Sequence, residues 1–463
     1  MLLGFLLLPL YSNYLTTEEY GIYSLAMATV NILGILSVNW VNVSTIRFYS
    51  EFEREEEVGK LMSLSLATLL GTTMICGLIL GGIIYTRLLP FENFLVIFTM
   101  FFLMNLERLY MGYLQGARKV RVKAKLKILY TVVRFTVTFI LLVVLGFNHL
   151  GIFYGNIGAS LVTLALIVLA EPHALPKLGK KDLPRIKEYL SYGYPFIWIL
   201  GVHWILTVSD RYMLEFIRGS GEVGIYALNY SLGEKTLLPM ITIFMGTAAP
   251  IIFQQVERGD RKGAQDTLDQ LFRFFLLLML PAVIGLSVIR HDLAELVIRR
   301  EFSEGVSILP VVALSYLFLG VRQYTNLTLE VEKKSREIGH ITFIVGGVNL
   351  LLNLFFIRSM GYQGAAYATL LSYGLYYLLS QRKAGKLTDM RVRFRGIHGK
   401  ILLAALLMGG GIALWDSLMP LTGVLMLLSK ILLGILIYGG AVVILKVFTM
   451  REIKSFRGRR GKK

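Results

Sequence analysis

The sequence has a single cysteine and few charged residues. Cys76 lies in the middle of an apolar run, so the chain can form no internal disulfide and has no thiol pair for redox chemistry. Only 17% of the residues are charged, whereas 55% are hydrophobic and the mean hydropathy is +0.63. A soluble protein rarely exceeds half apolar residues. This composition therefore points away from a soluble globular protein.

The motifs of common nucleotide-dependent and metal-dependent enzymes are also missing. Every Gly-Lys pair is followed by Leu, Lys or Ile, so no G-x-x-x-x-G-K-[ST] loop for nucleotide phosphates occurs. There is no D-x-D motif, and the six histidines form no H-x-x-x-H pair that would hold a metal on a helix face. We therefore expect no catalytic residues, no metal and no cofactor, and we predict that the chain is not an enzyme.

Long apolar runs are what the sequence has in abundance. A helix needs about 20 apolar residues to cross the hydrocarbon core of a bilayer. These runs are too long and continuous for barrel strands, and in lipid the backbone must then satisfy its own hydrogen bonds as helices. Thirteen runs and a short fourteenth at residues 1–10 predict an all-α polytopic membrane protein with about 14 transmembrane helices. The thirteen cover residues 20–46, 61–85, 93–115, 126–146, 150–170, 190–216, 223–250, 268–290, 305–328, 338–357, 363–380, 399–416 and 424–446.

The basic residues are divided unequally between alternate connections. Of the 48 Lys and Arg residues, 34 lie in one set of connections and in the C-terminal tail, six lie in the other set, and eight lie inside the runs. Such a bias places the basic connections in the cytoplasm. We therefore predict a multi-pass protein of the cytoplasmic membrane with a cytoplasmic C-terminus. The net charge of +18 is then a topology signal, and no nucleic-acid partner is expected.

Two pairs of segments show an internal repeat. EEYGIYSLA at 18–26 returns as GEVGIYALN at 221–229, an offset of 203, and HLGIFYGNIGAS at 149–160 resembles QGAAYATLLSYG at 363–374. The offset spans six runs, an even number, so both halves have the same orientation and form a parallel repeat. The repeat would begin the first helix about 13 residues before Met1, which predicts that this helix is truncated. A signal peptide is the alternative, although a basic start and a small-residue cleavage site are missing.

The repeat also predicts the domain organisation. We expect two pseudosymmetric lobes of six helices each, joined by a basic linker and followed by two additional helices. The boundaries are 1–170 for the first lobe, 171–189 for the linker, 190–380 for the second lobe and 381–463 for the additional helices and the basic tail.

Ionisable residues inside the runs are the candidates for function. Each costs at least ~2.5 kcal/mol at the bilayer centre, so each needs a partner, a wet cavity or a route to the interface. The basic candidates for binding a diphosphate are Arg47, Arg108, Arg134, Arg211, Lys235, Arg273 and Arg322, and Lys430 is a further basic residue in a run. The acidic candidates for the cavity or for ion coupling are Glu107, Asp210 and Glu234.

Position along the runs leaves two explanations open. Arg47, Arg273 and Arg322 lie near cytoplasmic ends and can snorkel to the head groups. The deeper residues, such as Arg134 and Lys235, fit either a cavity or an ion pair between helices. The surplus of basic over acidic residues favours an anionic substrate, because the guanidinium fork binds phosphate oxygens in pairs.

Three segments carry a family resemblance. LPLYSNYLTTEEYGIYSLA at the start, RFYSEF with Arg47, and SDRYMLEFIRGSGEVGIYALN resemble polysaccharide flippases of the O-antigen type. These belong to the multidrug/oligosaccharidyl-lipid/polysaccharide exporter superfamily. Arg47, Asp210 and Arg211 match recurrent family residues.

The resemblance implies a mechanism and partners. It implies alternating access around a central cationic cavity that moves an oligosaccharide on polyprenyl diphosphate from the cytoplasmic to the outer leaflet, for polysaccharide biosynthesis. The implied partners are this lipid-linked oligosaccharide, membrane lipids and other polysaccharide-assembly proteins. The alternatives are an ion-coupled multidrug exporter of the same superfamily, which the arginine surplus disfavours, and a membrane glycan polymerase or ligase. An enzyme of the latter kind would carry a large outer loop, and the longest outer connection, about 291–304, is short.

Overall fold

The computed structural model describes residues 2–85, 93–177, 183–419 and 423–447. Over these residues the chain is almost entirely helical and contains no strand, which confirms the all-α prediction. The basic tail from residue 451 onward and most of the connection after Tyr85 lie outside the described residues. The chain divides into two compact units, Met1–Ala227 and Leu228–Lys463. The predicted domain boundaries differ from this division and stay a prediction.

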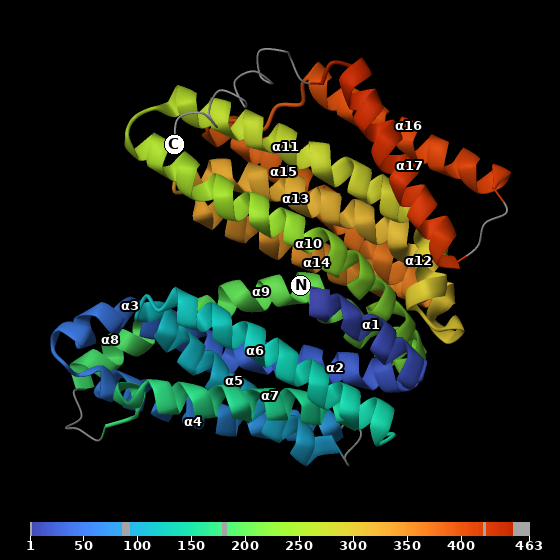
Figure 1. Ribbon diagram of the computed structural model, residues 1–463. Helices are drawn as coiled ribbons and strands as arrows, with labels where there is room; N and C mark the ends of the chain where they lie inside the picture. The colour runs from blue at the N-terminus through green and yellow to red at the C-terminus, as the bar shows by residue number, and fades with distance from the viewer. Residues whose placement is uncertain (1, 86–92, 178–182, 420–422, 448–463) are drawn as a thin grey trace. The chain divides into compact units, whose positions relative to one another are not determined.

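The helices follow one another with short connections (Figure 1). Those of the first unit are α1 (Leu2–Tyr14), α2 (Thr17–Gly34), the π-helix η1 (Ile35–Asn39), α3 (Trp40–Arg54), α4 (Val58–Tyr85), α5 (Phe94–Gly116), α6 (Val120–Phe139), the π-helix η3 (Ile140–Val144), α7 (Leu150–Ala170), the 3-10 turn η4 (Pro172–Ala174), α8 (Leu183–Gly193) and α9 (Pro195–Arg218). Helix α10 (Ser220–Glu257) starts in the first unit and continues into the second. The second unit continues with α11 (Arg261–Val288), α12 (Arg290–Val297), the 3-10 helix η5 (Arg300–Ile308), α13 (Leu309–Val331), α14 (Ser335–Met360), α15 (Tyr362–Leu387), α16 (Gly396–Leu418) and α17 (Gly423–Ile444).

Each predicted apolar run coincides with a helix. Within the described residues, 11 helices are long and apolar enough to cross a membrane, and α2, η1 and α3 join into one such helix, Thr17–Arg54. Large apolar side chains such as Leu78 (80% exposed) and Leu169 (78% exposed) lie on the outside of these helices, as expected for surfaces that face lipid. The chain is therefore a polytopic membrane protein, while the count of 14 helices stays a prediction.

The helix ends repeat in the same order in both halves. Residues with positive φ end helices at Glu56 and Gly259, at Arg118 and Lys333, and at Gly146 and Gly361. The first pair is separated by 203 residues, as the repeated motif is, and the other two by 215. The difference arises in the second half, where α12 and η5 are inserted before α13. Because left-handed residues mark helix termini, these matched ends support the predicted parallel repeat.

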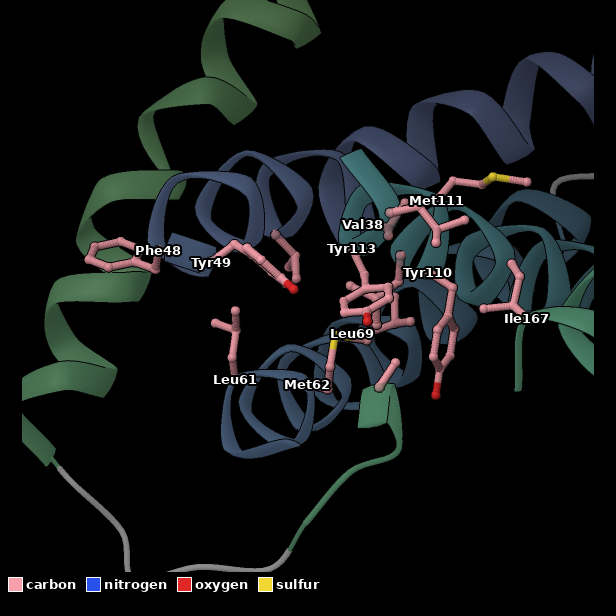
Figure 2. Packing of buried hydrophobic residues seen from close by; sticks show 14 of the residues in the cluster. Val38, Phe48, Tyr49, Leu61, Met62, Leu69, Tyr110, Met111, Tyr113 and Ile167 are labelled. Atoms are coloured by element: carbon pink, nitrogen blue, oxygen red, sulfur yellow. The ribbon is translucent and has the colours of Figure 1, made fainter. Parts of the chain in front are cut away.

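A buried cluster holds the first unit together. Figure 2 shows part of it, with side chains from η1, α3, α4, α5 and α7 packed against one another. Tyr49 and Tyr113 meet edge to face with ring centroids 5.7 Å apart. Between helices in lipid, such packing stabilises through dispersion and close fit rather than through removal of apolar surface from water. The labelled members are Val38, Phe48, Tyr49, Leu61, Met62, Leu69, Tyr110, Met111, Tyr113 and Ile167.

Helix α8 lies in the segment predicted as a linker and packs against α3. Tyr189 is 1% exposed, and its hydroxyl bonds with those of Thr45 (2.9 Å) and Ser65 (2.8 Å). Arg185 pairs with Glu55 at 2.7 Å, which lowers the pKa of that carboxyl. Burial raises the pKa of Tyr189 from 10.0 to about 12. The stability that the protonated Tyr189 hydroxyl contributes is therefore fully present below pH 10 and is lost as the pH rises through 12.

Within the second unit, a buried lysine connects the last two helices to α12. Lys430 of α17 is 2% exposed, and its ammonium group lies 2.7 Å from Asp292 of α12 and 2.5 Å from Asp416 of α16. Burial of an ammonium group is costly unless carboxylates and hydrogen bonds surround it, as they do here. Lys430 therefore has a structural role, and it is separate from the candidate functional residues.

Candidate functional site

Four basic side chains of α5 and α6 form what we call the cationic cluster: Arg108, Lys123, Lys127 and Arg134. The three on α6 are spaced at intervals of four and seven residues, so they lie along one helix face. Glu107 interacts electrostatically with Arg108, Lys123 and Lys127, and it is the one carboxylate of this group. The described cluster thus holds four basic groups against one acidic group.

Arg108 is positioned by polar residues and by a glycine of α2. Its guanidinium donates to the Asn31 side chain at 3.0 Å, and the side chain of Asn42 donates to its backbone carbonyl at 3.0 Å. A Cβ atom at Gly34 would lie 2.5 Å from a terminal nitrogen of Arg108, so a larger residue there would displace the guanidinium from its present position. Over the described residues, no carboxylate lies within ion-pairing distance of Arg108.

Arg134 lies beside an aromatic group at the other end of the cluster. Its guanidinium interacts electrostatically with Tyr11, Tyr23 and Tyr130, and the rings of Tyr11 and Tyr23 are 5.5 Å apart. The buried Nε atom of Arg134 has no hydrogen-bond partner in the described part of the chain. A desolvated donor without an acceptor is costly, so this arrangement is suited to an anion that supplies the acceptor.

Asp210 of α9 is a buried carboxylate held by hydrogen bonds. It is 5% exposed, accepts the Tyr226 hydroxyl at 2.5 Å, and accepts the backbone N–H of Arg211 at 2.8 Å. Tyr226 belongs to the repeated motif, and the tyrosine at the same place in the first copy, Tyr23, interacts instead with Arg134. The two copies thus place a tyrosine beside an acid in one half and beside a base in the other.

The glycine in each copy of the repeated motif packs against the helix that carries the other copy. A Cβ atom at Gly21 of α2 would overlap the carbonyl oxygen of Ser220, and one at Gly224 of α10 would overlap that of Thr17. Thr17 and Ser220 are themselves separated by the repeat offset of 203, so the contact is reciprocal. This close crossing of backbones requires glycine at both positions.

The crossing predicts that adding one methyl group at Gly224 lowers the stability of the protein. Gly224→Ala is expected to destabilise the protein by about 1–3 kcal/mol, because α2 and α10 must move apart to admit the methyl group. Thermal unfolding of the purified protein in detergent measures this. The matched control is Gly246→Ala on the same helix, where a Cβ atom would meet no described atom within 4 Å. A Gly224→Ala protein as stable as the control would contradict the crossing.

The other candidates have different surroundings. Arg47 is exposed and pairs with Glu51 at 2.9 Å, as expected for a side chain that reaches the interface. Arg322 of α13 is 7% exposed and lies 4.1 Å from the centre of the Tyr376 ring; it interacts electrostatically with Glu330 but forms no salt bridge among the described residues. This burial disfavours snorkelling. Arg273 donates to the backbone carbonyl of Val447 at 2.7 Å. Three further candidates are half-buried: Arg211, Glu234 and Lys235.

Lys123 and Lys127 were outside the candidate set, because the sequence places them in the basic connection at 115–127. In the structure α6 begins at Val120 and carries both on the helix. Their spacing to Arg134 is the signal that identifies them. Tyr11 and Tyr23 also lie beside Arg134, and neither was among the candidates from the sequence.

The fold and these residues define a class: an all-helical, multi-pass membrane protein whose matched helix ends support a parallel repeat, with more basic than acidic side chains inside its spans. The chain belongs to the polysaccharide biosynthesis protein family, whose model matches residues 1–256. This assignment and the neighbours below confirm the predicted resemblance to the polysaccharide members of the exporter superfamily.

Two relatives come from Haloferax volcanii. The chain is 23% identical over 309 residues to the probable low-salt glycan biosynthesis flippase Agl15, a match that covers 64% of this chain and 62% of the relative. It is 25% identical over 289 residues to the probable flippase AglR, covering 60% of this chain and 58% of the relative. The chain thus spans about three fifths of the length of these relatives.

Solved structures share the fold. The lipid II flippase MurJ in an inward closed conformation superposes with a TM-score of 0.77 at 18% identity, covering 96% of both chains. An inward-facing multidrug resistance MATE transporter has a TM-score of 0.64 at 12% identity, covering 83% of this chain and 94% of that one. At these identities the likeness establishes the fold and leaves the substrate open.

Proposed function

We propose that this protein is a flippase that translocates an oligosaccharide linked to polyprenyl diphosphate from the cytoplasmic to the outer leaflet, for polysaccharide biosynthesis. The observation that carries this proposal is that, among the described residues, Arg108, Arg134 and Arg322 form no salt bridge, although Glu107 and Glu330 interact with Arg108 and Arg322 electrostatically. Arginines inside membrane-spanning helices that form no salt bridge are suited to an anionic ligand.

The cationic cluster fits the diphosphate in charge and geometry. Each phosphate of the linkage carries negative charge, and the guanidinium groups of Arg108 and Arg134 can each bind two phosphate oxygens. Lys123 and Lys127 add point charges that draw an anionic head group toward the same helix face. The aromatic side chains beside Arg134 offer surfaces on which sugar rings can pack.

Alternating access is the mechanism we propose. The reciprocal crossing at Gly21 and Gly224 supports it, because the contact lies at the N-terminal ends of corresponding helices of the two halves. Hinge motions are absorbed by a few residues in loops and at the ends of helices, and this contact lies at two helix ends. The relatives named as flippases support the same function.

One observation favours the second candidate function, an ion-coupled multidrug exporter. Asp210 is a buried carboxylate bonded to a tyrosine, and buried acids are the groups that coupling ions bind in membrane proteins. We place the oligosaccharide flippase first because the basic residues in the spans outnumber the acidic ones. In the same proposal the protein lies in the cytoplasmic membrane with its C-terminus in the cytoplasm, works with other polysaccharide-assembly proteins, and has no catalytic activity.

A deletion strain distinguishes the two functions. Loss of the gene is expected to abolish the surface polysaccharide and to leave lipid-linked oligosaccharide in the inner leaflet, with sensitivity to cationic drugs unchanged. Normal surface polysaccharide together with increased drug sensitivity would overturn the proposal in favour of the exporter.

A further inference from the structure

The second unit contains an apolar cavity that is separate from the cationic cluster. Its volume is about 540 Å³, within the range of ligand-binding pockets. Side chains of α11, α13 and α15 line it, among them Leu280, Phe318 and Tyr377, and residues at the start of α16 line its remaining end. Two of its lining residues, Phe394 (57%) and Leu402 (42%), are also exposed on the outer surface, so the cavity adjoins the surface that faces lipid.

A buried histidine with an unused donor lines this cavity. His398 is 6% exposed, and its Nδ1 atom accepts the backbone N–H of Arg395 at 2.9 Å. In a neutral imidazole the proton must then be on Nε2. This buried Nε2 has no hydrogen-bond partner in the described part of the chain. A phosphate or ester oxygen at this end of the cavity would satisfy it.

The charge around this end is positive. Residues 391–400 contain four basic side chains and no acidic one. Arg395, which lines the cavity, also pairs with Asp269, the carboxylate that would compete with a ligand. The N-terminus of α16, a helix of 23 residues, adds the positive end of its dipole. An apolar cavity with a basic end fits a molecule with a hydrocarbon chain and an anionic head group.

We propose that this cavity binds one acyl chain of an anionic glycerophospholipid, with the phosphate held by Arg395, His398 and the N-terminus of α16. Basic pockets between membrane helices on the cytoplasmic side bind such head groups, and the basic segment 381–400 is predicted to lie on that side. The cavity is separate from the cationic cluster, since its residues all belong to the second unit and the cationic cluster belongs to the first.

Gly399 allows a direct test. It lines the cavity, and a Cβ atom there would meet no described atom within 4 Å, so Gly399→Leu adds a side chain to the cavity wall at a position with free space. Gly410→Leu is the matched control, since Gly410 lies exposed on the same helix, has the same free space and is not among the lining residues. The full-length protein in detergent is titrated with phosphatidylglycerol or with phosphatidylcholine of the same chains, and bound lipid is counted by native mass spectrometry.

Wild type and Gly410→Leu are expected to bind phosphatidylglycerol roughly tenfold more tightly than phosphatidylcholine. Gly399→Leu should lose this binding, and His398→Phe should keep lipid binding but lose the preference for the anionic head group. Equal affinity of wild type and Gly399→Leu for phosphatidylglycerol would overturn the proposal. So would equal affinity of wild type for the two lipids, or binding of polyprenyl phosphate in place of phosphatidylglycerol.

Discussion

Replacing Arg134 with alanine is expected to reduce translocation of the lipid-linked oligosaccharide at least roughly tenfold, with little change in the amount of folded protein. Charge-assisted hydrogen bonds to an ionised group contribute about 1.5–3 kcal/mol, which corresponds to a factor of ten or more. Because the buried Nε of Arg134 has no hydrogen-bond partner among the described residues, we expect this side chain to contribute little to the stability of the protein without its ligand. Arg134→Lys should retain part of the activity, because it keeps the charge but loses paired binding of phosphate oxygens.

The matched control for this prediction is Arg47→Ala. Arg47 is also an arginine of a spanning helix, but it is exposed and already paired with Glu51. Export of polysaccharide in a deletion strain, corrected for protein in the membrane, measures both variants. Lys235→Ala is expected to impair export in the same direction as Arg134→Ala. Equal export by Arg134→Ala and Arg47→Ala would remove Arg134 from the binding site.

Replacing Lys430 with methionine is expected to destabilise the protein by about 3 kcal/mol. The change leaves the carboxylates of Asp292 and Asp416 close together without their shared cation, and breaking a buried ion pair on one side costs about 3–5 kcal/mol. The lower end of this range applies because the Asp416 side chain is 55% exposed. Thermal unfolding in detergent is the measurement.

A compensating change gives the control for Lys430. Adding Asp292→Asn to Lys430→Met removes the repulsion between the carboxylates and should recover part of the lost stability. Lys446→Met, at an exposed lysine after α17, should change little. If Lys430→Met unfolded at the same temperature as Lys446→Met, the salt bridges of Lys430 with Asp292 and Asp416 would have no stabilising role.

Much of the fold could be predicted from the sequence because lipid permits few alternatives. Apolar runs long enough to cross a bilayer become helices, since no other open structure satisfies the backbone there. The repeat was visible in GIYSLA and GIYALN, and matched helix ends at Arg118 and Lys333 support it. The contact between Gly21 and Gly224 was not predictable, because a repeat in one sequence does not tell which of its residues cross.

The candidate site was predicted less completely. Counting charges within apolar runs identified Arg108 and Arg134, but it excluded Lys123 and Lys127, because basic residues at the start of α6 lower the local hydropathy. Helix α8 was assigned to a linker for the same reason. The partners of the buried groups, such as Asn31 for Arg108, come from helices distant in the sequence. These partners are determined by how the helices pack, which cannot be read from the composition of the sequence.

Transport by the purified protein in liposomes tests the central claim most directly. Two substrates carry the same oligosaccharide, one on polyprenyl diphosphate and one on an uncharged polyprenyl lipid, and a membrane-impermeant reagent reports which leaflet each occupies. We predict that the wild-type protein translocates the diphosphate-linked substrate and leaves the uncharged one behind. Equal movement of both lipids would contradict a binding site in which arginine side chains recognise phosphate.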